Sequence, residues 1–460
     1  MRIGLLPLGR ATFDVAFAEV KLSLMLKSLD ASGFETVGPR DLLFDGDATT
    51  AAIDTLKGEA IDQLLILQVT FTDASMTVAA ANALPVPLSI WAVPEPRHGG
   101  RLRLNSFCGL NLASHALGRN GRNFSWLYAD PETVAASDID DMLAGRRRAG
   151  QLTAAKGGHP TEEAEAIVGR IAGRRIGRIG AHPDGFDTCA YDPKALRALA
   201  GIEVDALELD QLFALARATN AAPVAALRAE VAGQITDLDT QDQDKLDRSL
   251  RLKLGLDKLR RDGRYHAFAI RCWPETFTEY GGAICGPVAI EGEARVPCAC
   301  EADVYGALTQ MILSEASGQP VFLTDLVDMD ATDDSGVVWH CGQAPLSMAA
   351  ASHPPRATVH SNRKMPLLYE FPLKPGRITL MRVSQSFGAP KMVLSGAEML
   401  DRPMAFTGTS GVMRFDRPAG EVLTDIIDSG LEHHMALTYG EHRPLLRSIA
   451  AALDLPVLEI

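Results

Sequence analysis

The first 130 residues alternate short apolar runs with amphipathic stretches of helical spacing, and this alternation constrains the fold more than any other feature. The apolar runs are IGLLPLG, DQLLILQVTF and VPLSIWAV, and helix-like stretches at 13–29, 50–57 and 75–84 lie between them. Buried parallel strands read as continuous apolar runs, and strands that alternate with helices are typical of a parallel sheet covered by helices. The sequence therefore predicts a layered αβα domain at the N-terminus.

The alternation of strand-like and helix-like runs returns after residue 174 and gives way to short β-type runs after residue 320. RRIGRIG, helical segments within 193–262 and HAFAI continue the αβ pattern. The later runs VFLTDLVDMD, GVVWHCG, MPLLYEFPL and GRITLMRVS are short and β-type, which favours an antiparallel sheet or a barrel. Because 460 residues exceed the usual ceiling of about 250–300 for one core, several domains are expected. We predict an α/β chain with two Rossmann-like αβα domains, 1–174 and 175–320, and a β-rich, barrel-like C-terminal domain, 321–460.

Charge and hydropathy exclude two classes of partner. The chain has 45 basic and 58 acidic residues and a formal net charge of −13, whereas phosphate contacts need clustered Lys and Arg. No apolar run reaches the roughly 18 residues of a membrane-spanning helix, and the N-terminus lacks the pattern of a signal peptide. Seven cysteines in a chain without an export signal favour reduced thiols. We therefore expect a cytoplasmic protein that binds neither nucleic acid nor a membrane.

Potential metal ligands gather at the ends of strand-like runs late in the chain. Glu301 follows one such run and precedes a helix, Asp325 ends VFLTD, and His340 ends GVVWH. His433 and His434 offer further imidazoles near the C-terminus. Strand ends are where α/β folds and barrels place their sites. Two carboxylates with imidazoles suit a divalent ion such as Mn²⁺ better than a structural zinc, and such a site can polarise an oxygen while a carboxylate moves a proton.

Each of these residues also has a purely structural interpretation. Glu301 could be an acid favoured by the dipole at a helix N-terminus, and Asp325 could cap a turn. His340 could be a core histidine bonded to backbone. From spacing alone, both interpretations stay open.

The sequence motifs of several segments indicate a family. CEADVYGALT, FLTDLVD and WHCGQAP resemble the metal-binding core of the L-fucose isomerase and L-arabinose isomerase superfamily. The resemblance extends back to GRIGAHPDGFD and IRCWPE and forward to EHHMALTYG, and it covers most of residues 175 to 440 in order and spacing. QVTFTDA and NSFCGLNLASHALGRNGRNF carry it into the N-terminal part.

The resemblance implies a metal-dependent aldose–ketose isomerase that works through a cis-enediol. Glu301 and Asp325 would bind Mn²⁺ or another divalent cation and act as base and acid. His340 matches a ligand of the arabinose branch. A C-terminal histidine would complete the sphere, and of His433 and His434 we favour His434.

A free sugar also needs partners for its hydroxyls, and seven residues are candidates for this contact. The resemblance places a loop containing Asp184 and Phe186 at the mouth of the site. Residue chemistry adds Trp273, Glu275, Trp91, Asn111 and His115, although a place in the core is an equal alternative for the two tryptophans. Four scattered arginines could meet an anionic group on the sugar or could simply be surface residues: Arg101, Arg103, Arg119 and Arg122.

The resemblance also implies an assembly in which a neighbouring chain's N-terminal domain forms the wall opposite the metal. We therefore predict a closed homo-oligomer, a trimer or hexamer, with His115 reaching the active site of an adjacent chain. Two other functions stay open. A metal-dependent hydrolase or lyase on a sugar-derived substrate could draw further carboxylates from the acidic run at 328–334. A non-catalytic sugar-binding protein is the third possibility.

Overall fold

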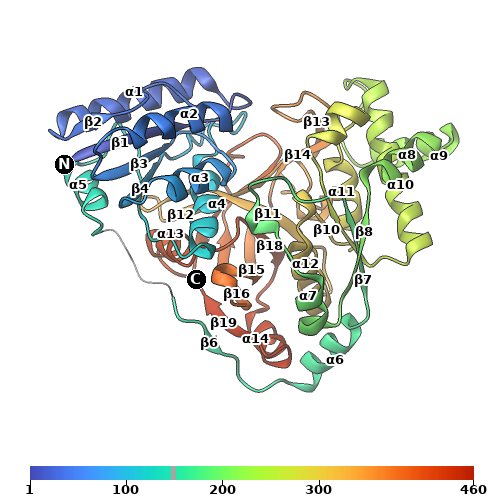
Figure 1. Cartoon of the computed structure of the whole chain (residues 1–460). Coiled ribbons are helices and arrows are strands. Elements are labelled where there is room, and N and C mark those ends of the chain that lie inside the picture. The colour runs from blue at the N-terminus through green and yellow to red at the C-terminus, as the bar shows by residue number, and fades with distance from the viewer. Residues whose placement is uncertain (147–151) are drawn as a thin grey trace.

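The N-terminal part forms a five-stranded sheet. The computed structural model describes residues 1–146 and 152–460 and places the strands in the order β2-β1-β3-β4-β5, all parallel (Figure 1). The run LLIL at the centre of the sheet is completely buried, as expected for a strand covered on both faces. The elements are β1 (Arg2–Leu8), α1 (Val15–Ala31), β2 (Glu35–Val37), α2 (Gly46–Lys57), β3 (Gln63–Gln68), α3 (Ser75–Ala83), β4 (Leu88–Ala92), α4 (Ser106–Arg119), β5 (Ser125–Tyr128) and α5 (Ala136–Leu143).

A second parallel sheet, in the order β10-β9-β7-β8, follows in the middle of the chain. The predicted strand HAFAI corresponds to β9. The elements are β7 (Arg175–Ile179), η1 (Asp187–Cys189), α7 (Pro193–Ala200), β8 (Glu203–Leu207), α8 (Leu209–Ala218), α9 (Ala221–Ala232), α10 (Gln243–Gly263), β9 (Ala267–Ile270), η2 (Thr276–Tyr280), α11 (Cys285–Glu293), β10 (Cys298–Ala299), η3 (Cys300–Ala302) and α12 (Val304–Ser317).

The C-terminal part forms a large mixed sheet. Strands β12, β11, β18, β15, β16 and β17 pair in this order, all antiparallel, and β17 pairs again with β12, so the strands form a closed ring. The elements are β11 (Phe322–Asp330), β12 (Ser335–His340), η4 (Leu346–Met348), β13 (Arg356–Thr358), β14 (Leu368–Pro372), β15 (Gly376–Ser384), η5 (Ser386–Gly388), β16 (Lys391–Met399), β17 (Thr409–Phe415), α13 (Ala419–Asp428), β18 (His434–Tyr439), α14 (Arg443–Ala452) and β19 (Pro456–Glu459).

Two segments that precede residue 175 lie against the C-terminal part. Strand β6 (Ala155–Lys156) pairs with β19, and helix α6 (Glu162–Ile171) packs on α14. The α/β character is thus confirmed, and the division into three domains at 174 and 320 stays a prediction. None of the described helices combines the length and the apolar character needed to cross a bilayer.

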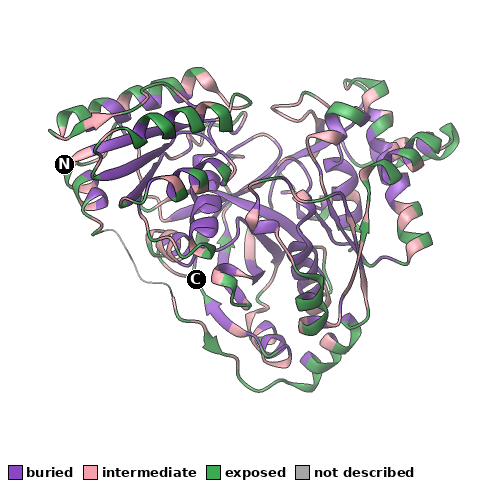
Figure 2. Cartoon of the chain, viewed as in Figure 1, coloured by how far each residue is buried: buried purple, intermediate pink, exposed green. Residues whose placement is uncertain are grey.

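Two buried helices pack between the sheets and position the elements that form the site. Residues 106–117 of α4 are all buried, because this helix packs against α13 and β11 of the large sheet as well as against its own sheet (Figure 2). Helix α12 is buried between β9 of the second sheet and β15 and β18 of the ring. A helix covered on several sides consists of small and apolar residues around its whole circumference, as both do. The start of α12 and the strands β11 and β18 consequently meet in one place.

Candidate active site

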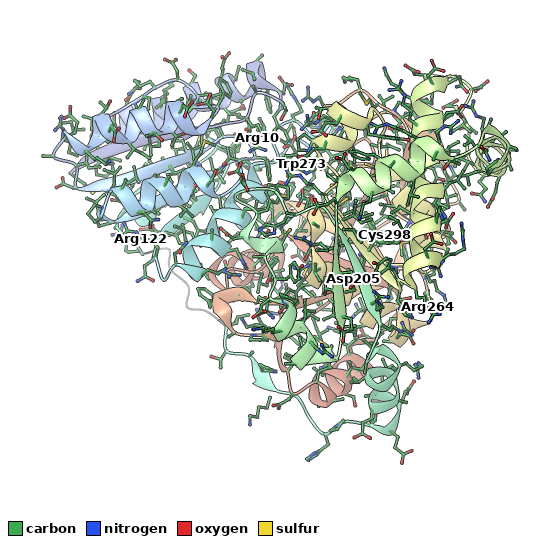
Figure 3. The ribbon with its side chains drawn as sticks, turned by 45° about the vertical axis from the view of Figure 1, so that its right-hand side comes forward. Arg10, Arg122, Asp205, Arg264, Trp273 and Cys298 are labelled. Carbon is green, nitrogen blue, oxygen red and sulfur yellow. The ribbon has the colours of Figure 1, made fainter. Side chains whose placement is uncertain are left out.

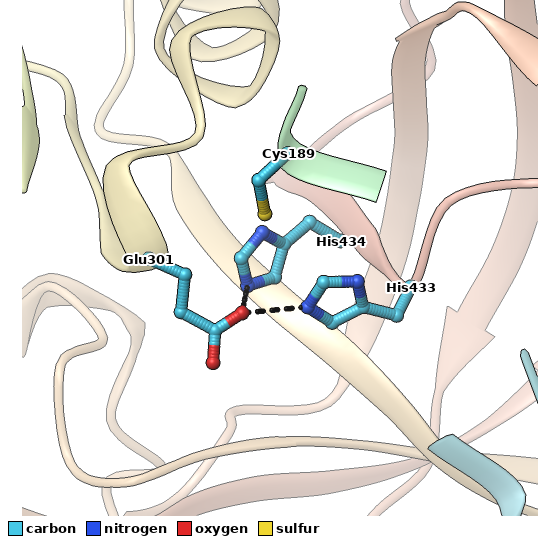
Figure 4. A group of neighbouring side chains, drawn as sticks. All are labelled: Cys189, Glu301, His433 and His434. Atoms are coloured by element: carbon cyan, nitrogen blue, oxygen red, sulfur yellow. Dashed lines mark hydrogen bonds and ion pairs between the residues drawn. The ribbon is translucent and has the colours of Figure 1, made fainter. Parts of the chain in front are cut away.

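Glu301 lies in the 3-10 turn η3, directly before α12. Its backbone is left-handed, with a φ of 58°, a conformation that costs a non-glycine residue free energy and is common at functional sites. Trp273 Nε1 donates to Oε1 at 3.1 Å, and His433 Nε2 donates to Oε2 at 2.9 Å, as the dashed line between Glu301 and His433 in Figure 4 marks. Burial alone would raise the pKa of Glu301, but the hydrogen bond and the charge of His433 lower it, so the carboxylate stays ionised.

His434 begins β18 and is oriented by a buried ion pair. Its Nδ1 donates to Asp303 Oδ2 at 2.9 Å, and Arg382 donates to both oxygens of Asp303 at 2.5 and 3.0 Å. Burial raises the pKa of Asp303, but the charges and hydrogen bonds of Arg382 and His434 together outweigh it and hold the pKa well below its usual range, so this carboxylate is ionised. An ionised acceptor fixes the proton of His434 on Nδ1 and leaves the lone pair of Nε2 free.

Asp325 brings the second carboxylate to the same point. It lies in β11, opposite His434 in register, and its Oδ1 is buried without a hydrogen-bond partner among the described residues. His434 Nε2 is likewise unpartnered within that part of the chain, and it lies 3.5 Å from Asp325 Oδ1 and 3.8 Å from Glu301 Oε2. Burial raises the pKa of Asp325 to about 6.

These unpartnered atoms fit a divalent cation. Ligand atoms of Asp325, His340 and His434 lie within 4.8 Å of one another, and those of Glu301 and His434 are equally close in a group with His433 and Cys189. Burial raises the pKa of the Cys189 thiol, which therefore keeps its proton and is a poor ligand. The Nε2 atom of His433 is already hydrogen-bonded to Glu301 Oε2. The donors that remain are two carboxylates and one or two imidazoles, a set that suits Mn²⁺.

A pocket opens over these side chains, and all three sheets contribute to it. Glu301 and Trp273 come from the second sheet, and Asp325 and His340 from the large one. The N-terminal part of the same chain adds a wall of seven residues: Arg10, Thr12, Phe13, Phe71, Leu102, Asn105 and Cys108. The pocket lining thus includes N-terminal loops of the same chain, and the contribution of a neighbouring chain to the wall opposite the metal stays a prediction.

The structure brings together most of the residues predicted to bind metal, and two of the predicted sugar contacts with them. Trp273 lines the pocket. Phe186 is buried beneath it, with its ring centroid 5.5 Å from that of Trp273 and 6.0 Å from that of His433, both edge-on. Phe186 supports the site from below.

Three predicted sugar contacts lie in the interior instead. Trp91 is 0% exposed and donates from Nε1 to the carbonyl of Ala129 at 3.0 Å. Asn111 and His115 lie on the buried helix α4, where Asn111 Nδ2 donates to the carbonyl of Leu431 at 2.7 Å. His115 is 1% exposed, and its Nδ1 donates to the carbonyl of Gly430 at 2.8 Å. His115 Nδ1 fastens α4 to the loop before β18, and its buried Nε2 has no partner among the described residues, so the structure gives no support to the prediction that His115 reaches an adjacent chain.

The remaining predicted contacts lie outside the pocket lining. Asp184 is exposed, and Glu275 is paired with Arg271 at 2.7 Å. The four arginines considered for an anionic group are also absent from the lining, and the donors of three of them are used elsewhere. Arg101 bonds to Thr12 and Asn362, Arg103 to Asp14, and Arg122 to the carbonyls of Leu84 and Val86.

The sequence reasoning did not single out three residues that lie at or directly behind the pocket. Asp303 had a usable signal, because an aspartate before VYGALT is a helix N-cap, and it accepts from Gly306 N at 2.8 Å in that role. Arg10 directly follows the first parallel strand, at the edge where α/β folds bind ligands. Arg363 lies in a turn, and no pattern in the sequence marked it.

Comparison with known proteins agrees with this site. The family described as "Fucose/sulfoquinovose isomerase, N-terminal domain" matches residues 4–148. A sulfoquinovose isomerase from Alkalicoccus urumqiensis is 30% identical over 458 residues, which cover 99% of this chain and 98% of the relative. Sulfoquinovose isomerases from Priestia aryabhattai and Clostridium sp. (strain MSTE9) are each 28% identical, over 98% and 99% of this chain and 97% and 98% of their own. The resemblance read from the central motifs is thereby confirmed, and the chain belongs to the fucose/sulfoquinovose isomerase family.

Proposed function

We propose that this chain is a divalent-metal-dependent aldose–ketose isomerase that converts sulfoquinovose, a glucose-type aldose with a sulfonate on C6, into its 2-ketose. Aldose–ketose isomerisation follows from the family. The observation that carries the metal dependence is the convergence of Glu301, Asp325 and His434 on one point, with the buried Asp325 Oδ1 and His434 Nε2 left without partners among the described residues. The substrate is taken from the relatives, which match over nearly the whole chain.

Glu301, Asp325 and His434 would hold the cation, with His340 as a fourth candidate ligand. Mn²⁺ is the ion that this donor set favours. When bound, such an ion polarises the oxygens at C1 and C2 and stabilises negative charge on them. Asp303 and Arg382 hold the imidazole of His434 in the tautomer that this role needs.

The two carboxylates differ in a way that suits two proton-transfer roles. From aldose to ketose, one proton leaves C2 while the C1 carbonyl oxygen gains one, which gives the enediol. A proton then returns to C1 while the C2 hydroxyl loses its own. Glu301, held ionised by His433, suits the removal of the carbon-bound proton, and Asp325, whose pKa burial raises to about 6, suits proton exchange with the oxygens.

The acidic residues at 328, 330 and 333, which a metal-dependent hydrolase or lyase could use as further ligands, are engaged in other contacts. Asp328 is buried and paired with Arg97 at 2.5 Å, and Asp333 is paired with Arg402 at 2.5 Å. Asp330 accepts the backbone N–H groups of residues 332 and 333. Asp328 joins β11 to the N-terminal part, and Asp330 and Asp333 hold the turn between β11 and β12, so these acids do not support a second metal.

Conversion in deuterated water tests the proposal. With Mn²⁺ and sulfoquinovose, we expect a 2-ketose sulfonate together with deuterium at C2 of the recovered aldose. EDTA should abolish both, and added Mn²⁺ should restore them. Cleaved products, or unchanged turnover in EDTA, would contradict the proposal.

The assembly, the location and the domain division are further parts of this proposal. We propose two αβα domains followed by a barrel-like domain, in a cytoplasmic homo-oligomer, trimeric or hexameric. Sedimentation velocity measures the assembly state, and a monomer with full activity would overturn the oligomer.

A further inference from the structure

The pocket carries opposite charge at its two ends. Glu301 and Asp325 lie at one end, and two arginines that the reaction does not use, Arg10 and Arg363, line the other part. No known role accounts for this second pair. A substrate that fits both ends must present oxygens for a cation at one end of its carbon chain and negative charge at the other.

Arg10 is held in the pocket wall by its neighbours. It follows β1, forms an ion pair with Asp73, and lies over two aromatic rings, 5.4 Å from the centroid of Phe71 and 5.9 Å from that of Trp273. Figure 3 shows Arg10 beside Trp273, where the N-terminal part meets the second sheet. The indole that donates to Glu301 is thus the one that contacts Arg10. One ring separates the two ends, a span that a six-carbon chain can bridge.

Arg363 projects from a turn that is fixed before any ligand binds. His360 Nδ1 accepts the backbone N–H groups of Asn362 and Arg363 at 3.2 and 3.3 Å, and the ring of His360 packs edge-on against Phe277. Arg101 donates to Thr12 O and to Asn362 Oδ1, which ties the turn to the N-terminal wall. The position of the Arg363 backbone is therefore set by contacts on both sides.

Arg363 also lacks a counter-charge. None of the ion pairs found within residues 1–146 and 152–460 includes it, and its guanidinium is half-buried, 5.8 Å from the centroid of Phe277. Burial lowers the pKa of Arg363, and the positive charge of nearby Arg10 lowers it further. Bringing two cations together in this partly desolvated part of the pocket, where Asp73 pairs with Arg10 alone, costs free energy that a bound anion would recover.

We infer that Arg10 and Arg363 form the subsite that binds the C6 sulfonate while C1 and C2 lie at Glu301 and Asp325; this inference rests on the proposed function. A tetrahedral oxyanion offers three acceptor oxygens, and guanidinium groups bind such acceptors through paired N–H donors. A phosphate ester shares this chemistry, so the experiment includes a phosphorylated sugar.

The test compares Arg363→Gln and Arg10→Gln with a matched control, Arg103→Gln. Arg103 also pairs with an aspartate and lies 3.6 Å from the centroid of the Phe17 ring, but it is not part of the pocket lining. Binding is measured by calorimetry on Mn²⁺-loaded protein and, without turnover, on the same variants in a Glu301→Gln background. The ligands are sulfoquinovose, 6-deoxyglucose and glucose 6-phosphate.

We expect each pocket variant to weaken sulfoquinovose binding about tenfold to a hundredfold, the range for a charge-assisted hydrogen bond, with no change for 6-deoxyglucose. Arg363→Lys should recover part of the loss, because it keeps the charge without the paired donors. Arg103→Gln should bind like the parent. Equal losses for the neutral sugar, or tighter binding of glucose 6-phosphate than of sulfoquinovose, would overturn the inference.

The outcomes also separate the two proposals. If the parent binds sulfoquinovose through these arginines but makes no ketose, the proposed function fails and the subsite stands. If the parent makes the ketose and the arginine variants bind sulfoquinovose normally, the subsite fails and the function stands. Thermal melting of each variant identifies any that does not fold, and Arg363→Lys then replaces the Gln variant.

Discussion

The reacting end and the anion end of the pocket are held in different ways. At the reacting end buried side chains orient the imidazole: Asp303 and Arg382 are each 1% exposed, and through them His434 has one orientation. At the anion end Arg10 and Arg363 are partly exposed and rest on aromatic faces and a turn. Proton transfer requires atoms held within a fraction of an ångström, whereas attraction between charges falls off gradually with distance. On the proposed function, the support is therefore rigid where bonds change and looser where the ligand is recognised.

Removing either carboxylate should have the largest effect. Glu301→Gln and Asp325→Asn each take away a charged ligand and a proton carrier, so we expect kcat to fall by about 10²–10⁴-fold or more. Steady-state kinetics and elemental analysis of bound metal measure the two losses. Glu275→Gln is the control, since Glu275 pairs with Arg271 outside the pocket, and normal turnover in Glu301→Gln would refute the assignment.

Loosening the support behind His434 should have the next largest effect. Asp303→Asn removes the charged acceptor of His434 and leaves Arg382 buried without the counter-charge of Asp303, so we expect about 10–100-fold weaker metal binding and a stability loss of about 3–5 kcal/mol. Metal titration and denaturant unfolding measure these quantities. Asp328→Asn breaks another buried acid–arginine pair and should lower stability without changing metal affinity. Equal metal affinity in both variants would show that the Asp303 pair does not position His434.

Trp273 separates the two ends, and its substitution sharpens the comparison further. Trp273→Phe keeps an aromatic face for Arg10 but removes the donor to Glu301, so we expect kcat to fall about tenfold with little change in sulfoquinovose affinity. Trp273→Leu should weaken both. An unchanged kcat in Trp273→Phe would mean that this hydrogen bond does not matter to the reacting end.

The smallest effect concerns Glu95, which supports the wall from behind by accepting the backbone N–H groups of Leu104 and Asn105. Burial raises the pKa of Glu95 from 4.5 to about 7. The folded state therefore holds a proton on Glu95 that the unfolded chain releases, and the free energy of unfolding falls as pH rises from 4.5 to 7.

Glu95→Gln should remove this pH dependence, which amounts to about 1–3 kcal/mol in the free energy of unfolding between pH 4.5 and 7. It should leave kcat and KM unchanged. Chemical denaturation at several pH values measures it. A slope equal to that of the parent would assign the pH dependence to other groups.

The sequence predicted the parts of this molecule that depend on local patterns. Continuous apolar runs marked the parallel strands, and the motifs around Glu301 and Asp325 marked the reacting end. The choice between His433 and His434 needed the structure, because it depends on Asp303, which is distant from both in sequence. Asn111 and His115 were misassigned for a similar reason. A polar residue on a helix is predicted to face a site or solvent, but α4 is covered on all sides, and its polar atoms bond to the carbonyls of a distant loop.

The two ends of the pocket also come from separate parts of the chain. Glu301, Asp325 and His434 belong to η3, β11 and β18, whereas Arg10 follows β1 and Arg363 lies in a turn between β13 and β14. Substitutions in these two connecting segments leave the reacting carboxylates and their buried neighbours untouched. Descendants of such a chain can therefore acquire new sugars through surface connections alone, while natural selection keeps the inherited chemistry constant.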